Sequence, residues 1–123
     1  MSHISKIELE VTDLESLDRA CSHIGLTLNR NQLTFKWYDG NGQCDHAIRI
    51  PGASYEIGLI KKDDKYELQT DFWDDKISEV IGENGGLLKQ RYAVEQTRTQ
   101  AIRKGYRVIE RQIDNTVRLH VRM

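Results

Sequence analysis

The residue types that most often do chemistry are scattered along this sequence and form no recognised motif. His3, His23, His46 and His120 stand at no zinc-binding spacing to one another, to a cysteine or to a carboxylate. The sequence also lacks the GxSxG, P-loop, GxGxxG and HExxH patterns of common catalytic sites. We therefore expect no catalytic apparatus, no metal and no cofactor. A small enzyme built around His3, His46 or His120 is a remaining alternative.

Two further clusters have both a chemical and a structural interpretation. The acidic residues Asp71, Asp74, Asp75 and Glu79 offer the oxygen ligands that a divalent cation needs, but their spacing does not match an EF-hand. The glycine-rich stretch 82–86 precedes a predicted helix, where backbone amides can bind an anion, but it lacks the lysine and hydroxyl of a P-loop. We favour a solvated acidic face and a flexible connector.

Charge is distributed unevenly along the chain. Residues 1–86 carry nine basic and sixteen acidic side chains, and residues 87–123 carry nine basic and three acidic ones. In one interpretation, the basic part neutralises the acidic part inside a single fold. In the other, it forms a surface for nucleic acid, a nucleotide phosphate or an acidic protein. The sequence alone leaves both interpretations open.

The basic part of the chain contains most of the candidate binding site. Arg91 and Arg98 are seven residues apart, about two helical turns, so they share one face of a predicted helix. Guanidinium groups suit phosphates and carboxylates because their planar fork binds either one in a bidentate manner. Trp73 is added as an aromatic beside charged residues, which makes it an interface candidate. The candidate binding residues are Gln90, Arg91, Tyr92, Arg98, Arg103, Lys104, Arg107 and Trp73, with Arg111, Arg118 and Arg122 extending the basic strip.

Hydrophobic periodicity indicates the elements that position these residues. Alternating apolar and charged residues predict a strand over residues 5–11. Thr12 and Glu15 then form a predicted capping box, and the apolar spacing after it predicts a helix that ends at Gly25. A second, longer helix is predicted from about Leu87 to Lys104.

Short strands and turns fill the chain between the two helices. The predicted strands lie at residues 26–28, 33–38, 46–50, 55–60 and 66–69, with a hairpin turn at 39–42, a short helix at 77–81 and a final hairpin that pairs 106–112 with 117–121. Because adjacent residues of a strand face opposite ways, one member of the pair Trp37 and Tyr38 should be buried and the other exposed.

This order of elements indicates an α+β fold: a mainly antiparallel sheet with two principal helices packed on one face and a C-terminal β-hairpin. The length and the absence of linkers predict a single domain over residues 1–123. No stretch is apolar enough to span a membrane and no apolar leader precedes the first strand, so we expect a cytoplasmic protein in which Cys21 and Cys44 are free thiols.

Several segments of the chain resemble one known family. They are the opening MSHISKI, the central YEIGL and YELQTDFW, the helical LLKQRYAVEQT, and the C-terminal KGYRVIER and VRLHVRM. In this order they resemble the family of hypothetical chloroplast reading frame Ycf number thirty-five, over nearly the whole chain. That family is a domain of unknown function found also in cyanobacteria, other bacteria and phages, so the resemblance implies no activity. It marks Gln90, Arg91 and Tyr92 as signature positions, and the loop 74–86 departs from the family.

These observations lead to two expected functions. The first is a non-catalytic binding or adaptor module that presents the basic helix to a protein partner. The alternative is a nucleic-acid or nucleotide-phosphate binding protein, whose affinity falls steeply with salt. An exposed edge strand of the C-terminal hairpin also offers a route to a homo-oligomer. The preferred function requires that Arg91 and Arg98 are free, and not paired with acidic residues of the same chain.

Overall fold

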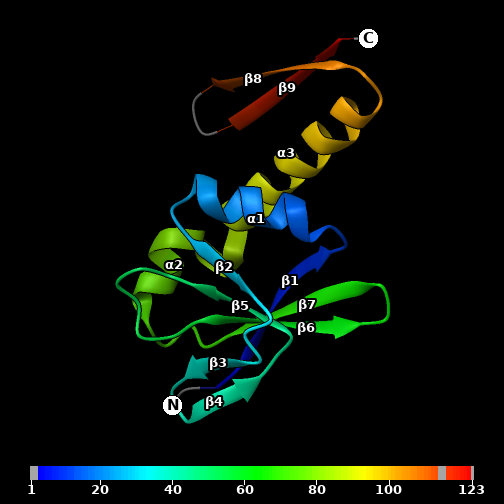
Figure 1. The fold of residues 1–123 in the computed structure, drawn as a ribbon. Coiled ribbons are helices and arrows are strands. Elements are labelled where there is room, and N and C mark those ends of the chain that lie inside the picture. Colours follow the sequence, from blue (N-terminus) through cyan, green and yellow to red (C-terminus); the bar gives the residue numbers. More distant parts are fainter. Residues whose placement is uncertain (1–2, 114–115, 123) are drawn as a thin grey trace.

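The computed structural model describes residues 3–113 and 116–122, and Figure 1 shows their arrangement. Its strands are β1 (Ser5–Val11), β2 (Thr27–Arg30), β3 (Thr34–Trp37), β4 (Gly40–Gln43), β5 (His46–Arg49), β6 (Ile57–Lys62), β7 (Lys65–Thr70), β8 (Arg107–Ile113) and β9 (Thr116–Arg122). Its helices are α1 (Leu14–His23), α2 (Asp75–Ile81), a 3₁₀ turn (Glu83–Gly85) and α3 (Gly86–Arg103). The predicted α+β class is confirmed.

Five of the strands form an antiparallel sheet in the order β1-β7-β6-β5-β2. The helices lie on one face of this sheet, and the apolar side chains that the strands point toward them form a contiguous core (Figure 1). Burial of this apolar surface is the main stabilising contribution to such a fold. The fully enclosed side chains of the core include Ile7, Val11, Leu17, Ile48, Ile57, Leu59, Leu68, Ile77, Ile81 and Leu88.

The opposite face of the sheet is partly covered by the β3–β4 hairpin. The ring of Phe35 is buried against Gly58 of β6 and Gly42 of β4, and a Cβ atom at either glycine would collide with it. We expected residues 33–38 to join the main sheet, and this is wrong. The tight turn that follows Trp37 makes β3 pair with β4 alone, as a separate two-stranded sheet.

The N-cap of helix α1 lies one residue later than predicted. Asp13 is the N-cap residue: its backbone is extended, and its carboxylate accepts the amide of Glu15 at 3.1 Å. The capping role predicted for Thr12 is therefore wrong, because its amide donates to the hydroxyl of Tyr92 at 3.1 Å, before the helix starts. The predicted end of the helix is confirmed, since Gly25 adopts a positive φ of 83°.

Helix α3 covers the sheet only with its first turns. Leu88 and Tyr92 belong to the core, whereas the last turns run past the sheet and carry the C-terminal hairpin, β8 with β9 (Figure 1). The helix is 18 residues long, about 27 Å, and its later turns contact β8 and β9. Among the described residues, no helix has the length and apolar character to cross a membrane.

Candidate functional site

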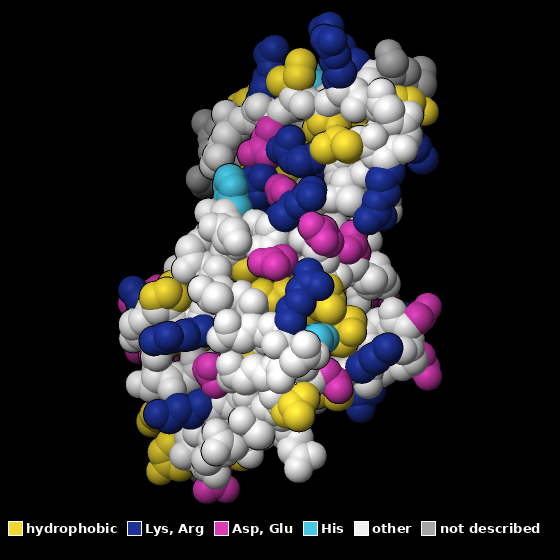
Figure 2. Space-filling model, in the orientation of Figure 1, with side chains coloured by type: hydrophobic (Ala, Val, Ile, Leu, Met, Phe, Trp, Pro, Cys, Tyr) yellow, Lys and Arg dark blue, Asp and Glu magenta, His cyan; other side chains and the backbone are white. Residues whose placement is uncertain are grey.

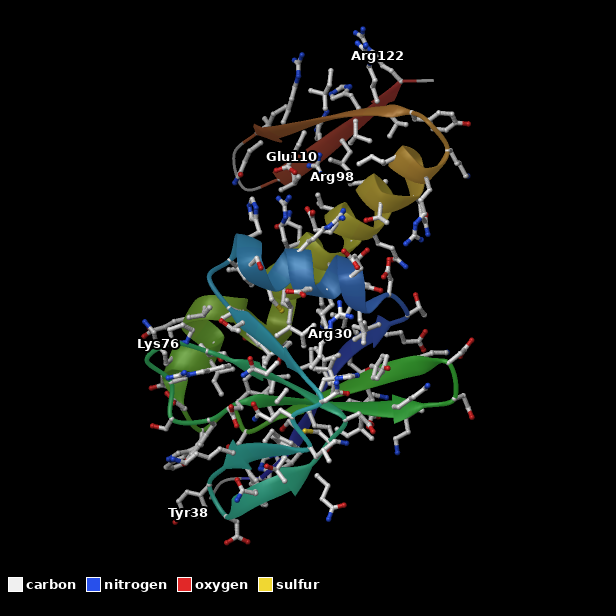
Figure 3. All side chains as sticks on the ribbon, viewed as in Figure 1. Arg30, Tyr38, Lys76, Arg98, Glu110 and Arg122 are labelled. Atoms are coloured by element: carbon white, nitrogen blue, oxygen red, sulfur yellow. The ribbon has the colours of Figure 1, made fainter. Side chains whose placement is uncertain are left out.

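The two arginines at the centre of the predicted site lie between α3 and the C-terminal hairpin. Arg91, Glu95 and Arg98 share one face of α3, and Glu110 of β8 meets them from the hairpin. The Arg91 guanidinium donates to both carboxylate oxygens of Glu110, at 2.9 and 2.7 Å, and to Glu95 at 2.5 Å. Arg98 points at Glu110 and also pairs with it (Figure 3). We call these four residues the ion quartet.

The ion quartet is a closed electrostatic unit with no net charge. Hydrogen bonds from Arg91 and, after them, from Arg98 lower the pKa of Glu110 to about 2. The same contacts with Glu110 and Glu95 raise the pKa of Arg91. The Arg91 side chain is only 8% exposed and that of Arg98 25% exposed. Both guanidinium groups therefore fasten the hairpin to the helix and are not free to receive an external ligand.

The other predicted residues of α3 lie in three different environments. Tyr92 is buried, and its hydroxyl accepts the amides of Thr12 and Asp13 at 3.1 and 3.3 Å. Gln90 is half-buried beside Arg91 in a small cleft of ≈ 160 Å³ between α1, α3 and the hairpin. Arg103 and Lys104 are exposed at the end of the helix. The residues that we predicted to form one binding face on α3 are thus divided between the core, the ion quartet and solvent.

A group of cations on the C-terminal hairpin faces solvent. Its strands are in register so that Arg107 lies opposite Arg122, and Arg111 lies opposite Arg118. Residues paired in this way share a face, and the alternating exposure shows that this is the outer face. Dark blue side chains accordingly crowd this end of the molecule in Figure 2. The outer hairpin face consists of Arg107, Ile109, Arg111, Ile113, Thr116, Arg118, His120 and Arg122, all exposed and none of them a carboxylate.

The inner face of the same hairpin packs toward α3. Val108, Leu119 and Val117 are half-buried there, and Glu110 reaches the ion quartet from the middle of this row. The period of two in the sequence 107–122 was the available signal for this division, because it separates the arginines from the valines and from Glu110. We predicted the hairpin but assigned its arginines to the same strip as those of α3.

The acidic cluster supports loops and is not assembled around a cation. Asp71 is 1% exposed and accepts the amides of Tyr38 and Trp73, at 3.3 and 2.9 Å. Asp74 caps α2 through the Lys76 amide at 3.0 Å and also accepts the amide of Ser54. Within residues 3–113 and 116–122, no group of three or more His, Cys, Asp or Glu side chains is arranged to hold a metal ion. Through Asp71 the backbone of Trp73 lies near that of Tyr38, and Trp73 is not part of the ion quartet.

The histidines that could have formed a catalytic site are not brought together. His46 is buried, and its Nδ1 accepts the amide of Asn31 at 2.9 Å. Burial lowers the pKa of His46, which keeps the ring neutral and suited to that acceptor role. His3 and His120 are exposed, at the start of the described chain and on the outer hairpin face. Both cysteines are free, and burial raises the pKa of Cys21 to about 12.

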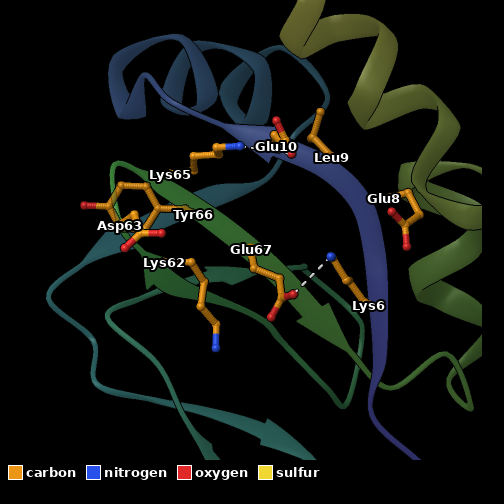
Figure 4. A pocket seen from close by; sticks show the side chains of 9 residues that line it. All are labelled: Lys6, Glu8, Leu9, Glu10, Lys62, Asp63, Lys65, Tyr66 and Glu67. Carbon is orange, nitrogen blue, oxygen red and sulfur yellow. Dashed lines mark hydrogen bonds and ion pairs between the residues drawn. The ribbon is translucent and has the colours of Figure 1, made fainter.

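A shallow cleft of ≈ 320 Å³ lies where β1 leaves β7 (Figure 4). The register of the two strands shifts between Ile7 and Val11, so β1 bulges away from its neighbour and opens the cleft. Two ion pairs cross its walls, as Lys6 binds Glu67 and Lys65 binds Glu10, both at 3.2 Å. Glu8, Lys62 and Asp63 also line the cleft, which therefore carries charge of both signs.

Comparison with known families adds one finding to this geometry. A family model described as "Protein of unknown function (DUF1257)" matches residues 20–120. The match covers most of the chain, from within α1 to the last strand. No curated protein and no solved structure matches.

Proposed function

We propose that this chain, which belongs to the DUF1257 family of proteins of unknown function, is a non-catalytic binding module. In this proposal it binds an acidic protein partner on its outer hairpin face. The single observation that carries the proposal is the composition of that face. It presents four arginines in two cross-strand pairs, and no carboxylate of the same face neutralises them. Like charges directly opposite each other destabilise an antiparallel pair, and an acidic partner would relieve this repulsion.

Apolar side chains on the same face support a protein as the partner. Ile109 and Ile113 are 41% and 48% exposed; Ile109 lies between the two arginine pairs, and Ile113 lies beyond the pair of Arg111 and Arg118. Protein interfaces are enriched in arginine and apolar residues and depleted in lysine, and this face contains no lysine. The outward edges of β8 and β9 carry unpaired backbone groups, which a strand of a partner can bind. The basic helix of the initial expectation is thereby replaced by the hairpin that the helix carries.

Nucleic acid is the second candidate, and the spacing of the arginines favours it. The two arginine pairs lie four residues apart along the strands, which corresponds to about 13 Å. A two-stranded ribbon fits the major groove of B-DNA, and arginine binds phosphates and guanine edges in a bidentate manner. His120 adds an imidazole N–H donor to the same surface.

A paired charge reversal on the hairpin tests the protein-binding proposal. The variant Arg111→Glu with Arg118→Glu reverses one cross-strand pair, and Lys61→Glu with Lys62→Glu makes the same change of charge on exposed positions of β6. We expect the first variant to lose a partner that wild type and the second variant both retain after crosslinking in the native host. The interaction is then remeasured with the purified partner by calorimetry. Equal binding by all three proteins would contradict the proposal.

Fluorescence anisotropy with purified protein separates the two candidates. Labelled mixed-sequence DNA duplexes and RNA single strands are titrated at low and at moderate salt. Binding whose affinity falls steeply with salt, and which the hairpin variant loses, would replace the protein partner by nucleic acid. Flat titrations up to high protein concentration remove the nucleic-acid candidate and leave the protein partner.

Two finer assignments accompany this proposal. We infer that the matched family is the one of hypothetical chloroplast reading frame Ycf number thirty-five, with members in cyanobacteria, other bacteria and phages. Support comes from the sequence segments named above, several of which lie within the matched residues 20–120. We also assign the protein to the cytoplasm, where free thiols such as Cys21 and Cys44 persist. Fractionation of the native host, followed by immunodetection, tests the location.

A further inference from the structure

We propose that the end of the molecule opposite the C-terminal hairpin is a second binding surface, which takes an arginine- or lysine-bearing segment of another protein. This surface, the aromatic end, consists of the exposed rings of Tyr38 and Trp73 with the half-buried Tyr55 beside them. Figure 3 places Tyr38 at one extreme of the molecule and Arg122 at the other. The proposal goes beyond the role of the hairpin and does not depend on it.

A buried carboxylate holds the backbone segments that carry the two exposed rings close together. Tyr38 follows β3 and Trp73 follows β7, 35 residues later in the chain, yet both backbone amides donate to the carboxylate of Asp71. Asp71 is 1% exposed, so it holds its two partners in a fixed geometry. The side chains themselves are left in solvent, Tyr38 64% and Trp73 62% exposed. The fold thus organises the backbone under these rings without burying them.

The third ring, that of Tyr55, belongs to a loop that lies at the same end of the molecule. Burial, followed by the charges of Asp71 and Asp74, raises the pKa of Tyr55. Ser54, the residue before it, donates its amide to Asp74 at 2.5 Å. The loop 51–56 is therefore held against the segment that carries Trp73. Aromatic side chains presented on such fixed loops lose little conformational freedom on binding, which is favourable for affinity.

The charge of the surrounding loops determines the sign of the charge that a ligand of this surface should carry. The loops 38–39, 51–56 and 71–74, which carry the rings, contain no lysine or arginine, and their carboxylates are Asp39, Glu56, Asp71 and Asp74; Asp75 follows as the first residue of α2. Of the flanking cations, Lys76 pairs with Glu79 at 3.7 Å, and Lys36 and Arg49 are exposed. An anionic ligand such as a nucleic acid would be repelled here. A guanidinium or ammonium group, in contrast, is attracted by the carboxylates and by the faces of tyrosine and tryptophan rings.

A short synthetic peptide of alternating arginine and glycine is the probe for this surface. Matched peptides carry lysine or glutamate in place of arginine. We expect the arginine peptide to bind best, the lysine peptide to bind more weakly and the glutamate peptide not to bind. The protein variants are Trp73→Ala, Tyr38→Ala and, as a control at the opposite end, Ile109→Ala. All three positions are exposed, so each variant should fold.

Calorimetry and the NMR signals of the Trp73 indole and the Tyr38 amide provide the readout. We expect Trp73→Ala to weaken the arginine peptide about tenfold, which is the scale of one cation–π contact. Asp39→Asn with Asp75→Asn should weaken it less, and Ile109→Ala not at all. Equal affinity of wild type and Trp73→Ala, or equal binding of the arginine and glutamate peptides, would overturn the proposal.

Sedimentation of the protein alone tests whether a second copy of this chain occupies the aromatic end. The outer hairpin face is itself cationic, so a second copy of the chain could supply the arginines. We expect no self-association that depends on the aromatic end. Self-association lost in both Trp73→Ala and Arg107→Glu would identify a second copy as the occupant and overturn the proposal of a separate partner.

Discussion

The body of the molecule, from β1 to the first turns of α3, and the C-terminal hairpin are held together by different interactions. The body has a continuous apolar core in which residues such as Leu59 and Leu68 are completely buried. None of the described residues of the hairpin belongs to that core; on its inner face Val108, Val117 and Leu119 are half-buried and Val121 is exposed. Its specific link to α3 is the ion quartet, in which Glu110 binds two arginines.

The body therefore provides most of the stability of the fold, whereas the hairpin presents arginine side chains to solvent. An isolated two-stranded hairpin is marginally stable in water, so the hairpin depends on its contacts with α3. A charged attachment of this kind fixes orientation but adds little apolar burial. The hairpin is therefore well placed to hold arginines away from the body, and its position is the more sensitive of the two to mutation, acid and salt.

Truncation of a core leucine should have the largest effect. Leu68→Ala removes a completely buried side chain between β1 and β6, and we expect a loss of about 2–5 kcal/mol in the free energy of unfolding. Urea denaturation followed by circular dichroism measures it. Leu33→Ala, at a position 66% exposed, is the matched control and should change little. A loss confined to Leu68→Ala supports an apolar origin for the stability of the body.

Neutralising the glutamate of the hairpin should have a smaller and local effect. Glu110→Gln removes charged hydrogen bonds to Arg91 and Arg98, each worth about 1.5–3 kcal/mol, and leaves Arg91 buried with one acidic partner. We expect amide exchange in β8 and β9 to accelerate about tenfold or more, while exchange in β6 and β7 stays unchanged. If β6 and β7 lost protection to the same extent, the two regions would be one cooperative unit.

Acid should release the hairpin before it unfolds the body. The pKa of Glu110 is lowered from 4.5 to about 2 by Arg91 and Arg98, so its stabilising contribution is complete above pH 4.5 and is lost as the pH falls toward 2. NMR signals of β8 and β9 should shift in this range. In Glu110→Gln the acid-induced change of these strands should be absent, and its persistence would assign it to another group.

The smallest effect is expected where the two regions meet at the surface. Arg103 lies 3.9 Å from Asp13, and its side chain is 67% exposed. Exposed ion pairs contribute about 0.2–1 kcal/mol at most, so Arg103→Ala should change the free energy of unfolding by less than that. A denaturation midpoint equal to that of wild type is the expected result. A large loss would mean that the end of α3 supports the body as well as the hairpin.

The sequence was sufficient for the elements because their local signals are strong. The alternation in β1 and the glycines at the ends of α1 and α3 each specify a local structure without reference to the rest of the chain. The turn predicted at residues 39–42 is wrong in its bounds, because the chain turns at Tyr38 and Asp39 and strand β4 begins at Gly40. Strand order was not predictable, since β1 pairs with β7 across 54 or more intervening residues. The separation of the β3–β4 hairpin depends on Phe35 finding Gly58, which no local pattern indicates.

The candidate site was harder to predict because charge alone does not reveal pairing. Arg91 and Arg98 look the same in sequence as Arg111 and Arg118, yet the first two face Glu110 and the last two face solvent. The distinction depends on which face of the hairpin meets α3, a property of the tertiary structure. Tyr38 and Trp73 likewise became neighbours only through Asp71.

The hydroxyl of Tyr92, which accepts two amides at the start of α1, has a consequence for the order in which the chain folds. Those amides lie 80 and 79 residues before their acceptor, and β1 also pairs only with a strand that emerges much later. During synthesis the N-terminal segment must therefore wait until most of the polypeptide has left the ribosome. Contacts of such long sequence separation slow folding, so a nascent chain that stops before residue 92 should remain a client of chaperones.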